Sequence, residues 1–372
     1  MRSQVSIVKC ADYRQPQVWN KVKESIDLIG GIEKFVPSGS SVLVKPNLLM
    51  ATPPETGVDT HPEVVRGVIK VLKEIGCKIY VGDGPSVWGR YAENVDSVYE
   101  QSGIKRVCIE EGVELVRFDK RRWRTHFPLT TWIDETQYLV SVPKFKTHEF
   151  TLLTGAIKNL YGLVSGTYKT ELHKQYFERK SFSKILVDIY EQKRPALSVV
   201  DGIVAMEGDG PGTSGKPRQL GLLIAGPDAV AVDSVMAVIM GVKPLDVFTN
   251  KEAKARGLGE TDINNIDILG ERLADVRGRP FLLPVTSLRS RIPQPIVNII
   301  KKFIRYRPVI RHEDCSSCGV CIEACPNKII SRRNGKTYID YSRCIYCFCC
   351  QESCPNSAIS IRKSLLARLV GL

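Results

Sequence analysis

The stretch "CSSCGVCIEACP" at residues 315–326 has a second copy, "CIYCFCCQESCP", at residues 344–355. Both copies have the spacing C-x2-C-x2-C-x3-C-P, and equivalent cysteines lie 29 residues apart. Cys349 in the second copy has no counterpart in the first. The proline after each fourth cysteine prevents the chain from continuing as a helix. The repeat therefore predicts one small duplicated unit with a single extra cysteine.

Cysteines at these gaps, followed by proline, are typical of domains that hold two [4Fe–4S] clusters, each bound by three thiolates of one loop and the fourth thiolate of the other. The spacing predicts one cluster on Cys315, Cys318, Cys321 and Cys354, and a second on Cys344, Cys347, Cys350 and Cys325. Zinc sites and disulfide frameworks also use closely spaced cysteines. The duplicated run of three cysteines favours iron–sulfur clusters over both. We interpret Cys349 as a thiol that binds no iron, with tuning of the second cluster or service as a replacement ligand as alternatives.

The composition is typical of a globular protein with reduced cysteines. Of the 372 residues, 43% are hydrophobic, which is enough to bury one large core beside a small module. The three cysteines outside the duplicated unit lie among apolar residues, as core thiols do. The N-terminal residues become polar before a signal peptide develops, and no apolar run reaches the ~18 residues of a membrane span. We therefore expect a cytoplasmic protein.

The net charge of +13 is concentrated in one connector. Residues 286–312 contain seven Lys and Arg and no Asp or Glu, with isoleucines at helical spacing. A basic amphipathic helix can lie on anionic lipid, but we favour a packed linker or the docking of an acidic redox partner protein. No motif indicates nucleic-acid binding. The expected domains are an α/β domain at 1–285, a basic amphipathic linker at 286–311, a two-cluster domain at 312–361 and a short basic tail at 362–372.

Residues 1 to 285 alternate β-rich runs with helical periods. Strands are predicted at 5–9, 40–49, 77–84, 112–119, 137–144, 196–202 and 219–226. Helices are predicted at 18–31, 61–76, 150–164, 184–192 and 228–241. The alternation predicts an α/β fold whose largely parallel sheet is flanked by helices, followed by a small α+β ferredoxin-like domain. Ligands of such sheets bind beyond the carboxyl ends of the strands.

Charged and amide side chains stand at several of these strand ends. The segment "VPKFKTHEF" at 142–150 carries two lysines on one face of an extended chain, followed by a histidine and a predicted helix. Cations beside a helix N-terminus favour an anion site, although each one alone is more often a solvated side chain or a turn residue. The predicted catalytic residues are His148, Lys146 and Asp201. The predicted substrate-binding residues are Lys45, Asn47, Asp83, Lys144, Lys158 and Asn159.

The glycine-rich stretch "GPGTSGKP" at 210–217 almost matches a phosphate-binding loop. Pro217 stands where a Ser or Thr would bind magnesium, and a predicted strand follows in place of a helix. We therefore predict no nucleoside-triphosphate site and expect a mobile loop over the strand ends.

Seven strings occur in order before the two-cluster segment: "VLVKPNLL", "THPEVVRGVIKVLKEIG", "VGDGPS", "VPKFKTH", "GAIKNLYG", "VVDGIVAMEGDGP" and "DAVAVDSVMAVIMG". In these strings the chain resembles the DUF362 family of iron–sulfur proteins, over about residues 5–270 and 312–361. The resemblance implies a cytoplasmic α/β domain with an appended ferredoxin module. It assigns no catalytic roles. The family pattern falls here on Lys45, Asn47, Asp83, Lys144, Lys146, His148, Lys158, Asn159, Asp201, Gly208, Gly210 and Asp233.

Two functions fit these features. The first is an oxidoreductase that exchanges electrons between its clusters and an anionic small molecule at the strand ends, with His148 or Asp201 moving the proton. Pairing single electrons usually requires a flavin or a further metal, and the sequence leaves open whether one is bound. The alternative is an electron carrier whose α/β domain only binds a ligand. We favour the enzyme because a docking platform needs no converging Lys, His, Asn and Asp side chains.

Overall fold

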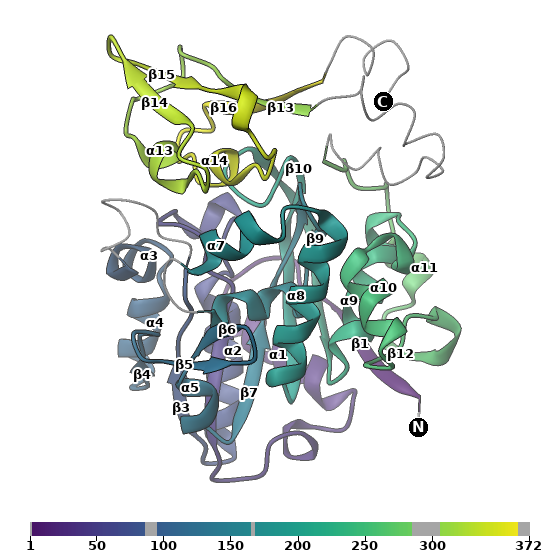
Figure 1. Ribbon diagram of the computed structural model, residues 1–372. Coiled ribbons are helices and arrows are strands. Elements are labelled where there is room, and N and C mark those ends of the chain that lie inside the picture. Colours follow the sequence, from purple (N-terminus) through teal and green to yellow (C-terminus); the bar gives the residue numbers. More distant parts are fainter. Residues whose placement is uncertain (1, 86–94, 165–167, 285–305, 364–372) are drawn as a thin grey trace.

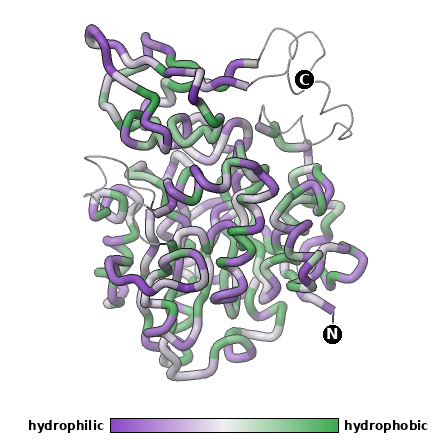
Figure 2. The backbone as a smooth tube through the Cα atoms, in the orientation of Figure 1, coloured by the Kyte–Doolittle hydropathy of each residue, from purple (hydrophilic) through white to green (hydrophobic). Residues whose placement is uncertain are grey.

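The computed structural model describes residues 2–85, 95–164, 168–284 and 306–363 of the chain. These residues form a large α/β domain and a small C-terminal domain, which lies above it in Figure 1. The predicted fold, a mostly parallel sheet flanked by helices with a small α+β domain at the C-terminus, is confirmed. Figure 2 shows that hydrophobic segments gather in the interior of the large domain.

One sheet runs through the large domain in the order β12-β1-β11-β10-β7-β2-β3-β4, with β8 paired to β10 and β9 paired to β8. Its strands are β1 (Ser3–Lys9), β2 (Ser41–Pro46), β3 (Lys78–Val81), β4 (Glu114–Leu115), β7 (Tyr138–Val142), β8 (Lys144–His148), β9 (Leu152–Thr154), β10 (Leu197–Gly208), β11 (Gly215–Gly226) and β12 (Ile266–Gly270). Strand β11 is antiparallel to both of its neighbours, and β9 is antiparallel to β8. The other pairs are parallel, so β2, β3, β7 and β10 end at the same edge of the sheet.

Helices cover both faces of this sheet and enclose two separate cores. One face packs against α1 (Gln17–Asp27), α2 (Pro62–Glu74), α3 (Val95–Gln101) and α4 (Ile104–Glu110). The other face packs against α6 (Ala156–Asn159), α8 (Arg179–Gln192), α9 (Ala229–Met240) and α10 (Phe248–Ala255). The shorter elements are β5 (Arg121–Arg124), β6 (Phe127–Thr130), α5 (Trp132–Glu135), α7 (Tyr168–Gln175) and α11 (Leu273–Val276).

Helix α9 shows how the sequence fixes the ends of an element. The Asp228 carboxylate accepts hydrogen bonds from the N–H groups of Val230 and Ala231, at 2.9 and 3.1 Å. These bonds satisfy donors that the first helical turn leaves unpaired. Gly241 ends the helix with a φ of 85°, which a residue with a side chain rarely adopts.

The predicted helix at 150–164 is wrong in its first half. Residues 152–154 form strand β9, which folds back on β8 and pairs Thr154 with Lys146. Helix α6 starts only after Gly155, where the Asp233 carboxylate accepts from the N–H groups of Ala156 (2.6 Å) and Ile157 (3.2 Å). Because the capping carboxylate comes from α9, the local sequence does not show where this helix begins.

The C-terminal domain consists of two antiparallel strand pairs around the cysteine loops. Strand β13 (Tyr306–Ile310) pairs antiparallel with β16 (Ile359–Lys363), and β14 (Ile330–Arg333) pairs with β15 (Lys336–Ile339). Short helices α13 (Val320–Ala324) and α14 (Cys349–Glu352) lie within the two cysteine repeats. Strand β13 thus places residues 306–310 of the expected linker in the small sheet, while 286–305 and the tail at 364–372 lie outside the described residues. No helix in the described part of the chain is long and apolar enough to cross a membrane.

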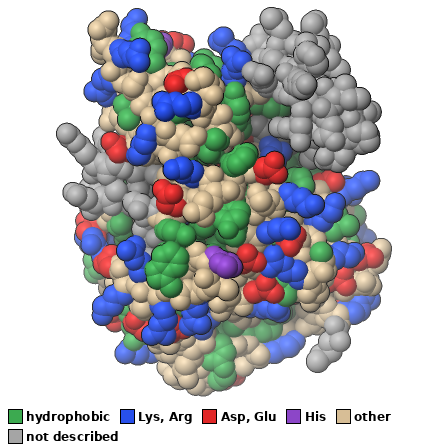
Figure 3. Space-filling model, in the orientation of Figure 1, with side chains coloured by type: hydrophobic (Ala, Val, Ile, Leu, Met, Phe, Trp, Pro, Cys, Tyr) green, Lys and Arg blue, Asp and Glu red, His purple; other side chains and the backbone are tan. Residues whose placement is uncertain are grey.

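The C-terminal domain packs onto the sheet edge where the parallel strands end (Figure 1). The Gln351 side chain donates to the Asp209 carbonyl at 3.0 Å, and the Thr213 hydroxyl donates to the Cys354 carbonyl at 2.8 Å. A Cβ added at Gly212 would lie 2.5 Å from the Glu352 carbonyl oxygen, so only glycine fits there. The glycine-rich loop at 209–214 therefore holds the second cysteine repeat. Figure 3 shows the surface of both domains, with lysine and arginine side chains over the small domain.

Candidate functional site

The structure groups eight cysteines of the repeats around two cavities. One cavity is lined by Cys315, Cys318, Cys321 and Cys354, and the other by Cys325, Cys344, Cys347 and Cys350. All twelve cysteines of the chain are free thiols. Each set combines three cysteines of one repeat with the fourth cysteine of the other, which is the arrangement found in two-cluster ferredoxins.

The backbone of the two loops is suited to a negatively charged group. Ser317 and Gly319 in the first repeat have φ values of 56° and 87°. Their equivalents in the second repeat, Tyr346 and Phe348, have φ values of 55° and 61°. Left-handed residues alternating with ordinary ones turn successive N–H groups toward one centre, as in many iron–sulfur sites. The thiols and the backbone of both cavities therefore fit [4Fe–4S] clusters.

Cys349 lines neither cavity. It is the first residue of α14, it is 2% exposed, and its helix faces the α/β domain. This position agrees with its interpretation as a thiol that binds no iron, which stays a prediction.

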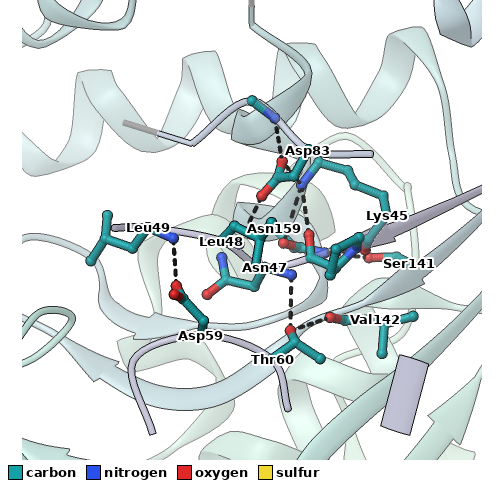
Figure 4. A network of polar contacts seen from close by, with 12 residues as sticks. Lys45, Asn47, Leu48, Leu49, Asp59, Thr60, Asp83, Ser141, Val142 and Asn159 are labelled. Atoms are coloured by element: carbon teal, nitrogen blue, oxygen red, sulfur yellow. Dashed lines mark hydrogen bonds and ion pairs between the residues drawn. The ribbon is translucent and has the colours of Figure 1, made fainter. Parts of the chain in front are cut away.

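Lys45 and Asp83 form a fully buried ion pair beneath this interface, with 2.6 Å between Nζ and Oδ1 (Figure 4). The Asn159 amide bridges the pair to the sheet, because its Oδ1 accepts from Lys45 Nζ at 3.3 Å and its Nδ2 donates to Ser141 Oγ at 2.9 Å. Asp83 also accepts from the N–H of Leu48 at 2.8 Å. These residues bind one another, so they hold the strand ends in place.

Asn47 lies beside this network with its side chain only partly bonded (Figure 4). Its backbone N–H donates to Thr60 Oγ1 at 2.9 Å. Its Oδ1 is buried and receives no hydrogen bond from the described residues.

Lys144 and Asp201 form a second buried pair, with 2.7 Å between Nζ and Oδ2. The Tyr13 hydroxyl donates to Asp201 Oδ1 at 2.9 Å and accepts from Lys144 Nζ at 3.1 Å. The N–H of His61 donates to Asp201 Oδ2 at 2.9 Å, and the His61 ring stacks on Tyr13. Both carboxylate oxygens of Asp201 are therefore occupied by groups of the chain itself.

Lys146, His148 and Lys158 lie where α14 meets the α/β domain. His148 Nε2 is 3.6 Å from Oε1 of Glu352, the last residue of α14. His148 Nδ1 accepts from the N–H groups of Phe150 and Thr151, at 3.0 and 3.3 Å, which assigns the ring proton to Nε2. His148 is therefore a neutral side chain that directs an N–H donor at α14.

The two lysines differ in their contacts. Lys146 is buried and donates to the Val58 carbonyl at 2.6 Å. Lys158 keeps part of its surface accessible, and its ammonium lies 5.9 Å from the centre of the Tyr161 ring. Lys158 is thus the less buried of the two lysines.

Burial shifts the pKa of the charged groups at this interface toward their neutral forms. It lowers the pKa of Lys158 to about 8, against the opposing effect of Glu352 and Cys349. It lowers the pKa of Lys146 and raises the pKa of Asp59, which lies close enough to oppose the shift of Lys146. It also raises the pKa of Glu352 to about 7. The low-dielectric surroundings therefore disfavour the charged forms of these groups.

The sequence model of the family described as "Domain of unknown function (DUF362)" matches residues 42–238, which is more than half of the chain. The chain belongs to the DUF362 family. A model described as "4Fe-4S dicluster domain" matches residues 307–355 of this DUF362 protein. A ferredoxin-type domain of this kind supports iron–sulfur electron transfer.

Among curated proteins, the DUF362 chain is 31% identical over 268 residues to thylakoid-associated protein sll1697 of Synechocystis sp., covering 70% of this chain and 82% of that protein. Among solved structures, it overlaps the lactate racemase apoprotein of Thermoanaerobacterium thermosaccharolyticum with a TM-score of 0.39 and 13% identity, over 61% of this chain and 54% of that one. A protein from Thermotoga maritima gives a TM-score of 0.36 and 15% identity, over 66% of this chain and 60% of that one.

Several residues of the DUF362 site were not predicted. Glu352 lies inside a cysteine repeat, and no local sequence pattern indicates its contact with the α/β domain. Asp59 precedes α2 and accepts from the N–H of Leu49 at 2.6 Å. Lys169 is buried and donates to the Gly84 carbonyl, and the Tyr161 hydroxyl donates to the Lys169 carbonyl at 2.9 Å. Polar residues at the strand ends could be expected from the sequence, but these partners could not.

Proposed function

We propose that this DUF362 protein is a ferredoxin-linked oxidoreductase that acts on an anionic small molecule held by Lys158 and Lys146. The observation that carries the proposal is the contact between the second cysteine repeat and the predicted site. Glu352 of that repeat lies against His148, with 3.6 Å between Oε1 and Nε2, and its charge opposes the lowering of the Lys158 pKa. The side of the small domain that carries Cys347 and Cys350 therefore faces the lysines of the α/β domain.

Each residue has a distinct part in this proposal. Two [4Fe–4S] clusters bound in the cavities supply single electrons at low potential. Lys158 holds the anion because its side chain is only partly buried, and Glu352 is the carboxylate whose charge opposes the lowering of its pKa. Lys146 is the proton donor, since burial lowers its pKa toward neutrality. His148 is neutral and donates its Nε2–H to the ligand, while Asp201 positions Lys144.

The cysteines indicate the compartment in which the protein works. Free thiols and clusters of this type persist in a reducing compartment, so we propose a cytoplasmic protein. A redox partner protein supplies or removes the electrons.

Replacing Lys158 with alanine tests the site. The Lys158→Ala holoprotein is expected to keep its iron content and to bind anions 10- to 100-fold more weakly, about the cost of losing a hydrogen bond from a charged group. The measurement is the concentration of an anionic fraction of host metabolites that gives half-maximal reoxidation of the dithionite-reduced protein. Lys184→Ala, on the exposed side of α8, is the matched control. Equal half-maximal concentrations for the wild type, Lys158→Ala and Lys184→Ala would show that Lys158 does not bind the anion.

The same assay is expected to depend on pH. The ammonium form of Lys158 binds the anion, and its pKa in the folded protein is about 8. Binding should therefore be complete below this pKa and weaken as the pH rises through about 8. Lys158→Arg, whose side chain stays charged, should retain binding at higher pH. A flat profile for both proteins would contradict the assignment.

The second candidate function is an electron carrier whose α/β domain serves as a binding module. The observation in its favour is that four of the predicted site residues form two closed pairs, Lys45 with Asp83 and Lys144 with Asp201. Closed pairs stabilise a scaffold without binding a substrate.

A further inference from the structure

The β14–β15 hairpin presents a basic surface beside the first cysteine repeat. We call the exposed residues Arg332, Arg333, Lys336 and Tyr338 the hairpin patch. Arg333 and Lys336 stand opposite each other across the two strands. Tyr338 is 45% exposed, which is unusual for so large a ring. The hairpin lies on the side of the small domain that points away from the α/β domain (Figure 1).

The positive charge of the hairpin patch is not neutralised by nearby acids. Three of the four exposed acids of the small domain pair with other bases: Asp314 with Arg311, Glu323 with Lys328, and Asp340 with Arg343; the fourth, Glu313, forms no ion pair with a described residue. Among the described residues, no carboxylate pairs with the bases of the hairpin patch. Residues 306–363 carry nine Lys and Arg against five Asp and Glu, so the small domain is basic as a whole (Figure 3).

The hairpin patch is attached directly to the first cysteine loop. The Arg332 guanidinium donates to the Ser317 carbonyl, and the Ser317 hydroxyl donates to the Gly335 carbonyl at 3.0 Å. Thr337 of the hairpin lines the same cavity as Cys318, and Cys318 is itself exposed. A protein bound at the hairpin patch would therefore lie next to the first cavity.

We propose that the hairpin patch docks an acidic one-electron carrier protein. An uncompensated basic surface around an exposed aromatic ring attracts an acidic partner at long range and gives it a central contact. The second cysteine repeat is covered by the α/β domain, so the first repeat is the accessible one. The inference concerns the partner and does not depend on the small molecule proposed above.

The probe is flavodoxin, an acidic flavoprotein, in anaerobic stopped-flow mixing with the oxidised holoprotein. One electron passes from the anionic flavodoxin hydroquinone to the oxidised holoprotein, so that the flavin becomes the neutral semiquinone and the holoprotein is reduced by one electron. Calorimetric titration with oxidised flavodoxin measures binding without electron transfer. The variant is Arg333→Glu with Lys336→Glu, and the control is Lys184→Glu with Lys251→Glu on exposed helices of the α/β domain.

We expect the hairpin variant to lower the second-order rate and the affinity about 10-fold at low ionic strength, with the difference vanishing in high salt. Arg333→Gln with Lys336→Gln should give a smaller loss of the same sign. Iron content should be unchanged in all variants. Unchanged rates and affinities in the hairpin variants, or an equal loss in the control, would overturn the proposal.

Discussion

Replacing Asp83 with asparagine is expected to destabilise the protein by about 3–5 kcal/mol, the usual cost of breaking a buried ion pair. The side chains of Lys45 and Asp83 are 0% and 2% exposed, so bulk solvent does not reach the lysine that loses its partner. A Cβ added at Gly162 would lie 2.0 Å from Asp83 Oδ1, which shows how tightly the backbone covers the pair. The measurement is the midpoint of guanidinium unfolding of the holoprotein under anaerobic conditions.

Two controls separate this effect from a general loss of charge. Glu24→Gln removes the partner of Lys21 in a surface pair whose side chains are 47% and 34% exposed, and it should change stability by no more than about 1 kcal/mol. Lys45→Met combined with Asp83→Asn should recover part of the loss, because no unpaired charge remains. A loss of less than about 1 kcal/mol for Asp83→Asn would mean that the Lys45 pair does not hold the strand ends.

Replacing Cys350 with alanine is expected to remove about half of the iron and acid-labile sulfide of the anaerobically purified protein. Cys350 lines the second cavity with three other cysteines, and a [4Fe–4S] cluster needs all four thiolates for stable binding. The spectrum of the remaining cluster should survive, because the first cavity shares none of these ligands.

Cys349→Ala is the matched control for Cys350→Ala. It removes a neighbouring thiol of the same short helix. Because the Cys349 thiol lines neither cavity, its loss should leave the iron content unchanged. If Cys349→Ala lost half of the iron and Cys350→Ala none, the register of the second loop would shift by one residue.

Part of this structure could be predicted because its signals are local. The alternation of strands and helices predicted the mostly parallel sheet. The spacing of the repeats predicted which four cysteines share a site, and the structure places the same sets around its two cavities. The clusters themselves stay a prediction. The extended segment with Lys144 and Lys146 is strand β8.

The rest depends on contacts between residues far apart in the sequence. Strand β9 was predicted as helix because the carboxylate that caps α6 belongs to Asp233, some 77 residues away. Lys45 and Asp83 were predicted to bind a substrate, but the strand ends place them against each other. Glu352 contacts His148 because the small domain packs on the sheet edge. The sequence around either residue therefore does not show the contact.

The most direct test of the central claim is reoxidation of the dithionite-reduced, full-length holoprotein by fractions of host metabolites. The protein is purified, and the reaction is measured, without oxygen. The wild type is compared with Lys158→Ala and with the exposed control Lys184→Ala. The account predicts that a small-molecule anionic fraction reoxidises the wild type and the control, and reoxidises Lys158→Ala far more slowly. Reoxidation by redox proteins alone, equal in all three, would contradict an enzyme and leave an electron carrier with a binding domain.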